Sequence, residues 1–379
     1  MKFTSALRVA TAAVAIGSLA SLAACSSSAA PPAEPGGSGE TIEIPGASAE
    51  ATEKLNELYQ AAVESGNTDI VFYGPSASTS QALLEVFTDR FPEVSVTLKD
   101  MADAQILTTM QTEAATGQRV GDLWWGGDSI QAAREADICT PIDVVTGPEG
   151  WDPPTAEEDR LIYFAYRMFG FAYNSDEVSE DEVPKSWNDL LEPEWKGKIA
   201  MGDPNAGALR HIFTGMLRPD GQKDKFGEEF IEDFAAQDLQ YVDPERNVSA
   251  EIASGRFPVG AGVFYGYYLQ QKEKGANVEF VFPLEGGGNF LSRSSLCAAK
   301  DGPAAEATEL FVNWIFTEEG QQALAEKDLS YGNTPTAPGP EGMASLDKID
   351  KLPFANPDPE FNKPFFEYIE KTFKNPNAQ

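Results

Sequence analysis

The sequence contains a single histidine, His211, and only three cysteines among its 379 residues. So few of these residues argue against a zinc cluster built from histidine and cysteine, and against a serine–histidine catalytic triad. Basic residues are scarce as well, because 28 Lys and Arg stand against 60 Asp and Glu, a formal net charge of -32. So large an acidic excess repels nucleic-acid phosphates and anionic lipid headgroups, and we expect neither as a partner.

Two sequence patterns of nucleotide binding and catalysis are also missing. Gly286-Gly287-Gly288 is not followed by the Lys and Ser or Thr of a Walker-type phosphate loop, so we expect a hinge or turn there. The nucleophile-elbow pattern of α/β hydrolases is not found either. We therefore expect a protein that is not an enzyme and has no cofactor. An exported α/β hydrolase-like enzyme and a surface adhesion lipoprotein are the alternatives.

The N-terminus has the pattern of an export signal. Lys2 and Arg8 accompany an apolar stretch over residues 10–22, which is too short and wrongly flanked for a stable spanning helix. The following Leu22-Ala23-Ala24-Cys25 resembles the bacterial lipobox. That resemblance implies that Cys25 becomes the lipidated first residue of the mature protein. A plain signal peptide with an incidental cysteine is the alternative.

The next segment is composed for flexibility. Residues 1–24 are expected to form the signal peptide, and residues 25–48 are mostly Ser, Ala, Pro, Gly and Glu. Such a composition buries too little apolar surface to fold, so we expect a lipidated tether that holds a soluble body at the extracytoplasmic face of the cell membrane.

Two cysteines remain after Cys25. Cys139 and Cys297 form an even pair in a chain that is expected to leave the reducing cytoplasm. We predict a disulfide between them. The alternative is two buried free thiols, since spacing in the sequence does not give their separation in space.

The folded body alternates between strand-like and helix-like segments. Residues 69–74 form a short apolar run that ends at glycine, which predicts a buried strand. Residues 76–91 place apolar side chains on one helical face, with Ser80 near the start, where N-caps occur. The β-α-β-α-β-α order predicts an α/β fold with a parallel sheet covered by helices. The expected strands are 69–74, 94–98, 122–125, 169–174, 198–201, 259–265 and 278–282, and the expected helices are 76–91, 103–116, 128–136, 186–191, 206–217, 304–316 and 318–327.

Several segments in fixed order carry a family resemblance. They are Trp187-Asn188-Asp189-Leu190-Leu191, Glu194-Trp195-Lys196-Gly197-Lys198-Ile199, Asp203-Pro204-Asn205-Ala206-Gly207-Ala208, Phe282-Pro283-Leu284-Glu285-Gly286-Gly287, Ala307-Thr308-Glu309-Leu310-Phe311-Val312-Asn313-Trp314 and Glu318-Glu319-Gly320-Gln321. Over roughly residues 68–340 the set resembles the ferric-iron, sugar-phosphate and phosphonate group of periplasmic binding proteins. No single segment is decisive, but the ordered set is fairly specific.

The resemblance implies a two-lobed, type II periplasmic-binding-protein fold with a hinge between the lobes. The first lobe would comprise residues 49–165 and 285–379, and the second lobe residues 166–284. Such a receptor closes around its ligand, because ligand contacts select the closed state. It then delivers the ligand to an ABC permease that a separate ATPase drives. We expect a monomer.

Four candidate ligand contacts follow predicted strands, where ligands bind in open α/β sheets. Hydroxyls and amides at a helix start suit an anion, and glycines allow a close approach to the backbone. Ordinary N-caps and tight turns are the alternative. The candidate residues are Ser76, Ser78 and Thr79 after the first strand, Asp128 after Gly126-Gly127, Asn205 and Gly207 in the second lobe, and Tyr265, Tyr267 and Tyr268 after a later strand.

The tyrosine cluster leaves two ligands open. Tyr267 and Tyr268 match the adjacent phenolate ligands of ferric-binding family members, and hard ferric iron favours anionic oxygen. The histidine that some relatives place after the first strand is missing here, although some iron binders manage without it. If the tyrosines instead pack or stack, an organic anion such as a phosphorylated or phosphonate solute is expected. Iron would need a carboxylate such as Asp100, Asp103 or Asp128, and an organic anion would need Arg210, Arg256 or Arg293. We expect His211 to be structural.

Overall fold

The computed structural model describes residues 41–74, 80–126, 137–151, 155–156, 160–283, 286–344, 346–353 and 359–374. Residues 41–379 form one unit. The predictions of a signal peptide at 1–24 and of lipidation at Cys25 concern residues outside this description, as does most of the predicted tether. Across the described ranges, no helix is long and apolar enough to cross a membrane.

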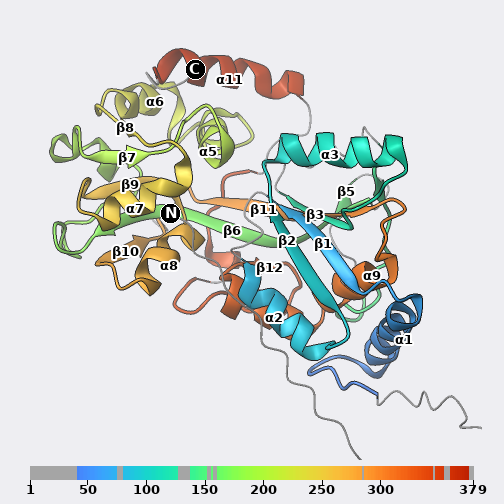
Figure 1. Ribbon diagram of the computed structural model, residues 1–379. Helices are drawn as coiled ribbons and strands as arrows, with labels where there is room; N and C mark the ends of the chain where they lie inside the picture. The colour runs from blue at the N-terminus through green and yellow to red at the C-terminus, as the bar shows by residue number, and fades with distance from the viewer. Residues whose placement is uncertain are drawn as a thin grey trace, which may run out of the picture. The chain divides into compact units, whose positions relative to one another are not determined.

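One mixed sheet of twelve strands runs through the described residues (Figure 1). Its main path has the order β2-β1-β3-β11-β6-β9-β7-β8, and β4, β5, β10 and β12 pair with the two longest strands, β6 and β11. The strands are β1 Asp69–Gly74, β2 Ser95–Asp100, β3 Leu123–Gly126, β4 Cys139–Thr140, β5 Thr155–Ala156, β6 Leu161–Asn174, β7 Ile199–Met201, β8 Gln240–Tyr241, β9 Val259–Phe264, β10 Val278–Val281, β11 Phe290–Ala299 and β12 Tyr331–Gly332.

The pairing confirms only part of the expected parallel sheet. β1 is parallel to β2 and to β3, and β7 is parallel to β8 and to β9. In the middle, β11 and β6 run antiparallel to each other and to their neighbours β3 and β9. The alternation of strands and helices predicts the two parallel ends. It does not reveal that two long strands join them.

Helices flank the sheet along its whole path. They are α1 Ala49–Ser65, α2 Gln81–Arg90, α3 Asp103–Thr116, α5 Gly207–Leu217, α6 Gly227–Ala235, α7 Val248–Ala253, α8 Tyr265–Glu273, α9 Ala305–Trp314, α10 Glu318–Ala323 and α11 Pro359–Thr372, with a π turn at Leu324–Asp328 and a short 3-10 turn at Glu245–Asn247. Three expectations need correction. Tyr265 opens α8 instead of ending β9, and the helix predicted at 318–327 continues as a π turn. The helix predicted at 186–191 is only a 3-10 turn at Asp189–Leu191. The helix predicted at 128–136 lies outside the described residues.

Of the four hydrophobic clusters in the described residues, the two largest lie at the two parallel ends of the sheet and are called the first and second core here. In the first, the ring of Phe311 on α9 meets Phe72 of β1 at 5.0 Å and Phe87 of α2 at 5.2 Å. In the second, Trp187 packs edge-on against Phe171 and Phe213. β6 serves both cores, because Phe164 is buried in the first and Phe171 in the second. Between these two positions, Met168 of β6 belongs to a further cluster that also contains Tyr265 and Tyr268.

The C-terminal helix α11 packs on the second core. Phe373, just after α11, lies 4.6 Å from the ring of Phe213, and Ile369 is fully buried beside α5 and α6. Figure 1 shows α11 lying along these two helices. The sequence interpretation did not include this helix. The predicted lobe boundaries stay a prediction.

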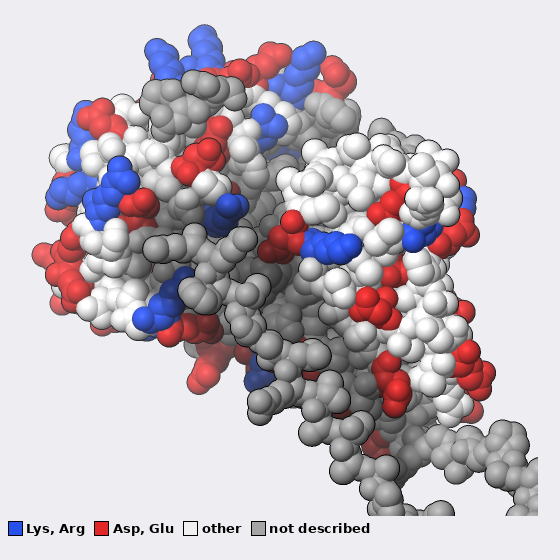
Figure 2. All heavy atoms as spheres, viewed as in Figure 1, with Lys and Arg blue, Asp and Glu red and all other residues white. Residues whose placement is uncertain are grey.

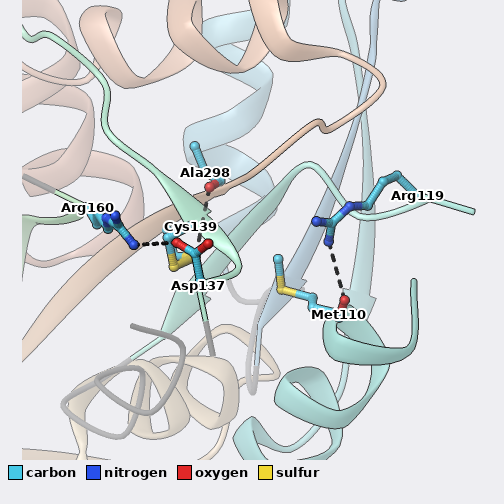
Figure 3. The surroundings of a disulfide bond; sticks show 7 residues. Met110, Arg119, Asp137, Cys139, Arg160 and Ala298 are labelled. Carbon is cyan, nitrogen blue, oxygen red and sulfur yellow. Dashed lines mark hydrogen bonds and ion pairs between the residues drawn. A yellow bond between two sulfur atoms is a disulfide. The ribbon is translucent and has the colours of Figure 1, made fainter. Parts of the chain in front are cut away.

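A disulfide joins Cys139 of β4 to Cys297 of β11, with the two Cα atoms 5.3 Å apart (Figure 3). The predicted pairing is confirmed. Near it, Asp137 accepts hydrogen bonds from Arg160 at 2.5 Å and from Lys300 at 3.0 Å. The hydrogen bond from Lys300 is the largest cause that lowers the pKa of this exposed carboxyl group.

On the face drawn in Figure 2, the acidic side chains are spread out and not gathered in one patch. Figure 2 shows Asp and Glu side chains scattered among Lys and Arg over one face of the molecule. This distribution fits a charge that keeps the protein soluble, and it assigns no ligand.

Candidate ligand-binding site

Parallel strands end at a common edge in each of the two cores, and ligands of open α/β sheets bind at such edges. β1 and β3 end at Gly74 and Gly126 in the first core, and β7, β8 and β9 end in the second. The loops after β1 and β3 lie outside the described residues. The predicted contacts Ser76, Ser78, Thr79 and Asp128 belong to them, so their placement stays a prediction.

Arg167 of β6 lies between the two cores. Its guanidinium carbon is 5.0 Å from the ring centre of Trp125 near the end of β3 and 5.4 Å from that of Phe264 at the end of β9. Both rings are buried, and the Arg167 side chain is only 15% exposed. A cation held between two aromatic faces is stabilised by the rings, and it is fixed in orientation. One arginine thus connects a strand end of each core.

A buried carboxylate balances this charge. Arg167 donates through Nη2 to Asp328 Oδ1 at 3.3 Å and to Ser80 Oγ at 3.0 Å. Asp328 also accepts from the hydroxyls of Ser80 and Ser330, at 2.5 and 2.6 Å. Ser80 does precede α2 as expected, but its hydroxyl does not cap that helix, because it is used to bind Asp328.

Two buried donors beside this ion pair have no acceptor among the residues that the structure describes. Arg167 Nε and Trp125 Nε1 are both buried, and neither has a hydrogen-bond partner among the residues described. A buried donor left unsatisfied costs about 1–3 kcal/mol, so it calls for an explanation, and an acceptor on a bound ligand is one. Two of them on stacked side chains form a donor pair suited to an acidic oxygen.

The turn from β7 to α5 offers a second set of groups. Asp203 Oδ1 accepts from the backbone and side-chain nitrogens of Asn205, at 3.0 and 3.1 Å. These bonds hold the turn, so the Asn205 amide nitrogen already has a partner. α5 begins at Gly207 with Ala206 at its N-cap, which has no side chain that could cap the helix. The first amides of α5 are therefore left without a side-chain acceptor at the N-cap.

Glu245 follows β8 and reaches over this turn. A Cβ atom on Gly202 would lie 3.0 Å from the Cβ and Cγ of Glu245, and one on Gly207 would lie 3.2 Å from its Oε2. The Glu245 side chain therefore runs from the end of β7 to the start of α5. Part of its surface stays exposed, yet burial in this dense region raises its pKa to about 7.

The three candidate tyrosines point in different directions. Tyr265 and Tyr268 are buried and pack against each other and against Phe280 of β10. The pKa of Tyr268 is raised to about 12, chiefly by burial and in part by the nearby Glu279 carboxylate. Tyr267 is only partly buried and meets the ring of Phe264 edge-on at 5.2 Å. Of the three, Tyr267 thus lies against the ring that Arg167 covers.

The other charged candidates are placed elsewhere. Arg210 lies over Phe366 of α11, Arg256 pairs with Glu251 on the surface, and Arg293 lies over the ring of Tyr163. Asp100 ends β2 on an exposed position. The side chain of Asp103 lies outside what the structure describes. In the described ranges, no three His, Cys, Asp or Glu side chains are grouped as a metal site. His211 stacks on Phe290, which agrees with a structural role.

Sequence reasoning missed Arg167, Trp125, Asp328 and Glu245. A signal for Arg167 was present, because it is the one charged residue in the 14-residue run of β6, where burial is otherwise nearly continuous. A charge in such a strand needs a partner and suggests a function. Asp328 gave no such signal, because a single aspartate shortly before Ser330 is not unusual in a surface-like sequence.

Similarity to known proteins extends over most of the chain. The model of the family "Bacterial extracellular solute-binding protein" matches residues 122–364. The Fe(3+)-binding periplasmic protein of Serratia marcescens is 23% identical over 70% of this chain and 79% of its own length.

Solved structures show the same fold. Iron-bound HitA from Pseudomonas aeruginosa is 18% identical, with a TM-score of 0.61 over 80% of this chain and 99% of that one. The periplasmic binding protein AfuA from Actinobacillus pleuropneumoniae, with fructose 6-phosphate bound, is 20% identical, with a TM-score of 0.58 over 80% and 96%. The predicted two-lobed α/β binding-protein fold is therefore confirmed, and the chain belongs to the bacterial extracellular solute-binding proteins.

Proposed function

We propose that this protein is the extracytoplasmic receptor of an ABC importer and that its ligand is a small organic anion, such as a phosphorylated or phosphonate solute. The observation that carries the proposal is the donor pair of Arg167 Nε and Trp125 Nε1, which is buried between the strand ends of the two cores. Charge-assisted hydrogen bonds from a planar guanidinium suit the oxygens of an acid group. A ligand held by groups from both lobes favours the closed form, because it binds that form more tightly than the open one.

Ferric iron is the second candidate, favoured by the iron-binding relatives. It would need Tyr267 and Tyr268 as adjacent phenolates, and that arrangement stays a prediction. The position of Tyr268 speaks against it, since the ring packs on Phe280 and its raised pKa disfavours the phenolate form. An organic anion makes no such demand on Tyr268.

The remaining parts of the proposal follow from the family and the sequence. We place the protein on the membrane through a lipid on Cys25, with an ABC permease and a separate ATPase as partners. Its named relatives bind or take up solutes, and we propose that this chain likewise binds without chemical conversion. The predicted lobes, 49–165 with 285–379 and 166–284, would close around the ligand as a monomer.

Titration calorimetry with two probes tests the ligand class. We expect fructose 6-phosphate to bind, ferric citrate to give no tyrosinate absorption band, and Arg167→Gln to weaken phosphate-ester binding about 10- to 100-fold, since charged hydrogen bonds contribute about 1.5–3 kcal/mol. Arg256→Gln is the matched control, because Arg256 is an exposed arginine that pairs with Glu251. Iron binding with a visible band that Tyr267→Phe abolishes, and no phosphate-ester binding, would contradict the proposal.

A further inference from the structure

The long strand β6 is open to solvent at one place only. Its residues are all buried except Tyr166, Arg167 and Phe169, which are partly buried. Side chains alternate between the two faces of a strand, so Arg167 and Phe169 share one face and Tyr166 lies on the other. Because β6 is paired along both sides, with β11 and with β9, the exposed part of Phe169 faces away from the sheet, on the face of Arg167.

The neighbouring strand β11 is open at the same place. Ser292 pairs with Arg167, and Phe290 pairs with Phe169. Directly opposite residues of an antiparallel pair project from the same face. Ser292 is partly buried, whereas Phe290 is 2% exposed. Arg167, Phe169 and Ser292 therefore form one partly open surface on the two long strands, which we call the strand floor.

Phe169 is the aromatic ring that the strand floor leaves accessible. It meets the ring of Phe264 at 5.5 Å and that of Phe290 at 5.6 Å. Those two rings are both less than a tenth exposed, and each has a partner, since Arg167 lies over Phe264 and His211 stacks on Phe290. Of the three rings, only Phe169 keeps an open surface for a ligand.

A packing role alone does not explain this open surface. Phe171 and Tyr173 follow on the same face of β6, and both are buried in the second core. Phe169 precedes them in the middle of the sheet, yet part of its ring stays uncovered. It stays uncovered beside Arg167, whose Nε has no hydrogen-bond partner among the described residues.

The cation and the ring suit two adjoining parts of one ligand. The Arg167 guanidinium suits an acid group. An accessible phenyl ring gains most from an apolar group that covers it, above all from another ring. Residues two apart in a strand are about 6.6 Å apart, so the acid group and the apolar group must be close neighbours in the ligand.

We infer that the strand floor binds an aromatic ring of the ligand against Phe169, directly beside the acid group that Arg167 holds. This inference rests on the proposed organic-anion function and deepens it. The ligand class is a small aromatic acid, in which the acid group is attached to the ring directly or through one atom.

Titration calorimetry with two phosphate monoesters tests the inference. Phenyl phosphate and ethyl phosphate share the acid group and differ in the ring. We expect wild-type protein to prefer phenyl phosphate by about tenfold or more. In Phe169→Ala we expect this preference to fall to about threefold or less, while ethyl phosphate binds as before. Phe365→Ala, the same change at a partly buried phenylalanine of α11, should leave both affinities unchanged.

The wild-type result is decisive even if a variant does not fold, which circular dichroism checks. Equal affinity of wild-type protein for the two esters would overturn the inference. A preference for phenyl phosphate that survives in folded Phe169→Ala would overturn the role of Phe169. If Phe169→Ala does not fold, Phe169→Leu takes its place, and we expect it to weaken phenyl phosphate binding about threefold, whereas an unchanged affinity would overturn that role.

Fructose 6-phosphate separates the inference from the proposed function. Binding of fructose 6-phosphate or ethyl phosphate without a preference for phenyl phosphate would overturn the aromatic ligand and leave the organic-anion proposal standing. Failure of all three esters to bind would overturn both.

Discussion

The guanidinium of Arg167 stacks 5.0 Å from the centre of the Trp125 ring while it donates to the carboxylate of Asp328 at 3.3 Å. The aromatic contact and the ion pair both hold the guanidinium in place. The ion pair uses Nη2, and Nε has no hydrogen-bond partner among the described residues. This is the arrangement expected of a ligand-binding cation that must keep its position between two lobes.

Removing the cation should destabilise the protein. In Arg167→Gln the Asp328 side chain, 2% exposed, would remain buried without its counter-charge, and we expect a loss of about 2–4 kcal/mol in the free energy of unfolding. Urea denaturation measures it. The exposed pair of Arg256 and Glu251 is the control, where Arg256→Gln should cost at most about 1 kcal/mol. Equal losses in the two variants would show that the Arg167–Asp328 pair contributes no more to the free energy of unfolding than an exposed pair.

Glu245 should make stability depend on pH. Its pKa is about 7 in the folded protein against 4.5 ordinarily, so between these values the folded state binds more protons than the unfolded state. Its contribution to stability is therefore fully present below pH 4.5 and is lost as the pH rises through 7, by up to about 3 kcal/mol. Burial is the cause of the raised pKa.

Thermal unfolding at pH 5 and pH 8 measures this dependence. The difference in stability between wild type and Glu245→Gln should change with pH in the direction given, with wild type relatively weaker at pH 8. A difference that is the same at both pH values would show that Glu245 titrates as an ordinary exposed carboxyl group.

The space at Gly207 can be tested with a matched glycine. Gly207 and Gly66 both have positive φ, +51° and +72°, but an added Cβ at Gly66 meets nothing within 4 Å, whereas at Gly207 it meets Glu245. Substitution by alanine should cost about 1 kcal/mol at either position for the backbone alone. Only Gly207→Ala should also alter the affinity for fructose 6-phosphate. An equal affinity in both variants would separate Gly207 from the site.

The disulfide should be structural. We expect Cys139→Ala to lower the free energy of unfolding by about 2–5 kcal/mol, because Cys139 and Cys297 are 158 residues apart and their bond restricts the unfolded chain. Guanidinium denaturation measures the loss. Thiol labelling of the unreduced, denatured wild-type protein should find neither of the two cysteines free, and labelling of both would contradict the bond.

The lipid anchor is tested on cells. Cys25→Ser should release the protein from membranes without changing its fold, because the lipobox resemblance makes that cysteine the lipid carrier. Fractionation followed by circular dichroism of the released protein checks both points. Continued membrane association of the variant would rule out this anchor.

The regular parts of the fold could be predicted because their patterns are local. The strand at 69–74 and the helix stopped by Gly117 match β1 and α3, since apolar runs, helical faces and glycine stops act within a few residues. The sequence predicted β6 only at 169–174. The first half of this strand has no turn residues before it that would mark where the strand begins. Its role in both cores depends on pairing with β11, more than 100 residues away.

The site could be predicted by region but not by residue. Sequence reasoning placed the site after the strands that precede Asn205 and Tyr267, because parallel strands present their loops at one edge, and this placement stays a prediction. Which side chains meet there depends on long-range contacts. Arg167 and Asp328 are 161 residues apart, and Tyr268, adjacent to Tyr267, turns into the core against β10. Their roles in binding stay predictions until a ligand is measured.

Native mass spectrometry of the protein purified from its own host, together with its absorption spectrum, tests the central claim most directly. The account predicts a bound mass that corresponds to a small organic anion, no tyrosinate–iron band, and loss of that mass in Arg167→Gln but not in Arg256→Gln. A bound ferric ion with a visible charge-transfer band, retained in Arg167→Gln and lost in Tyr267→Phe, would contradict it.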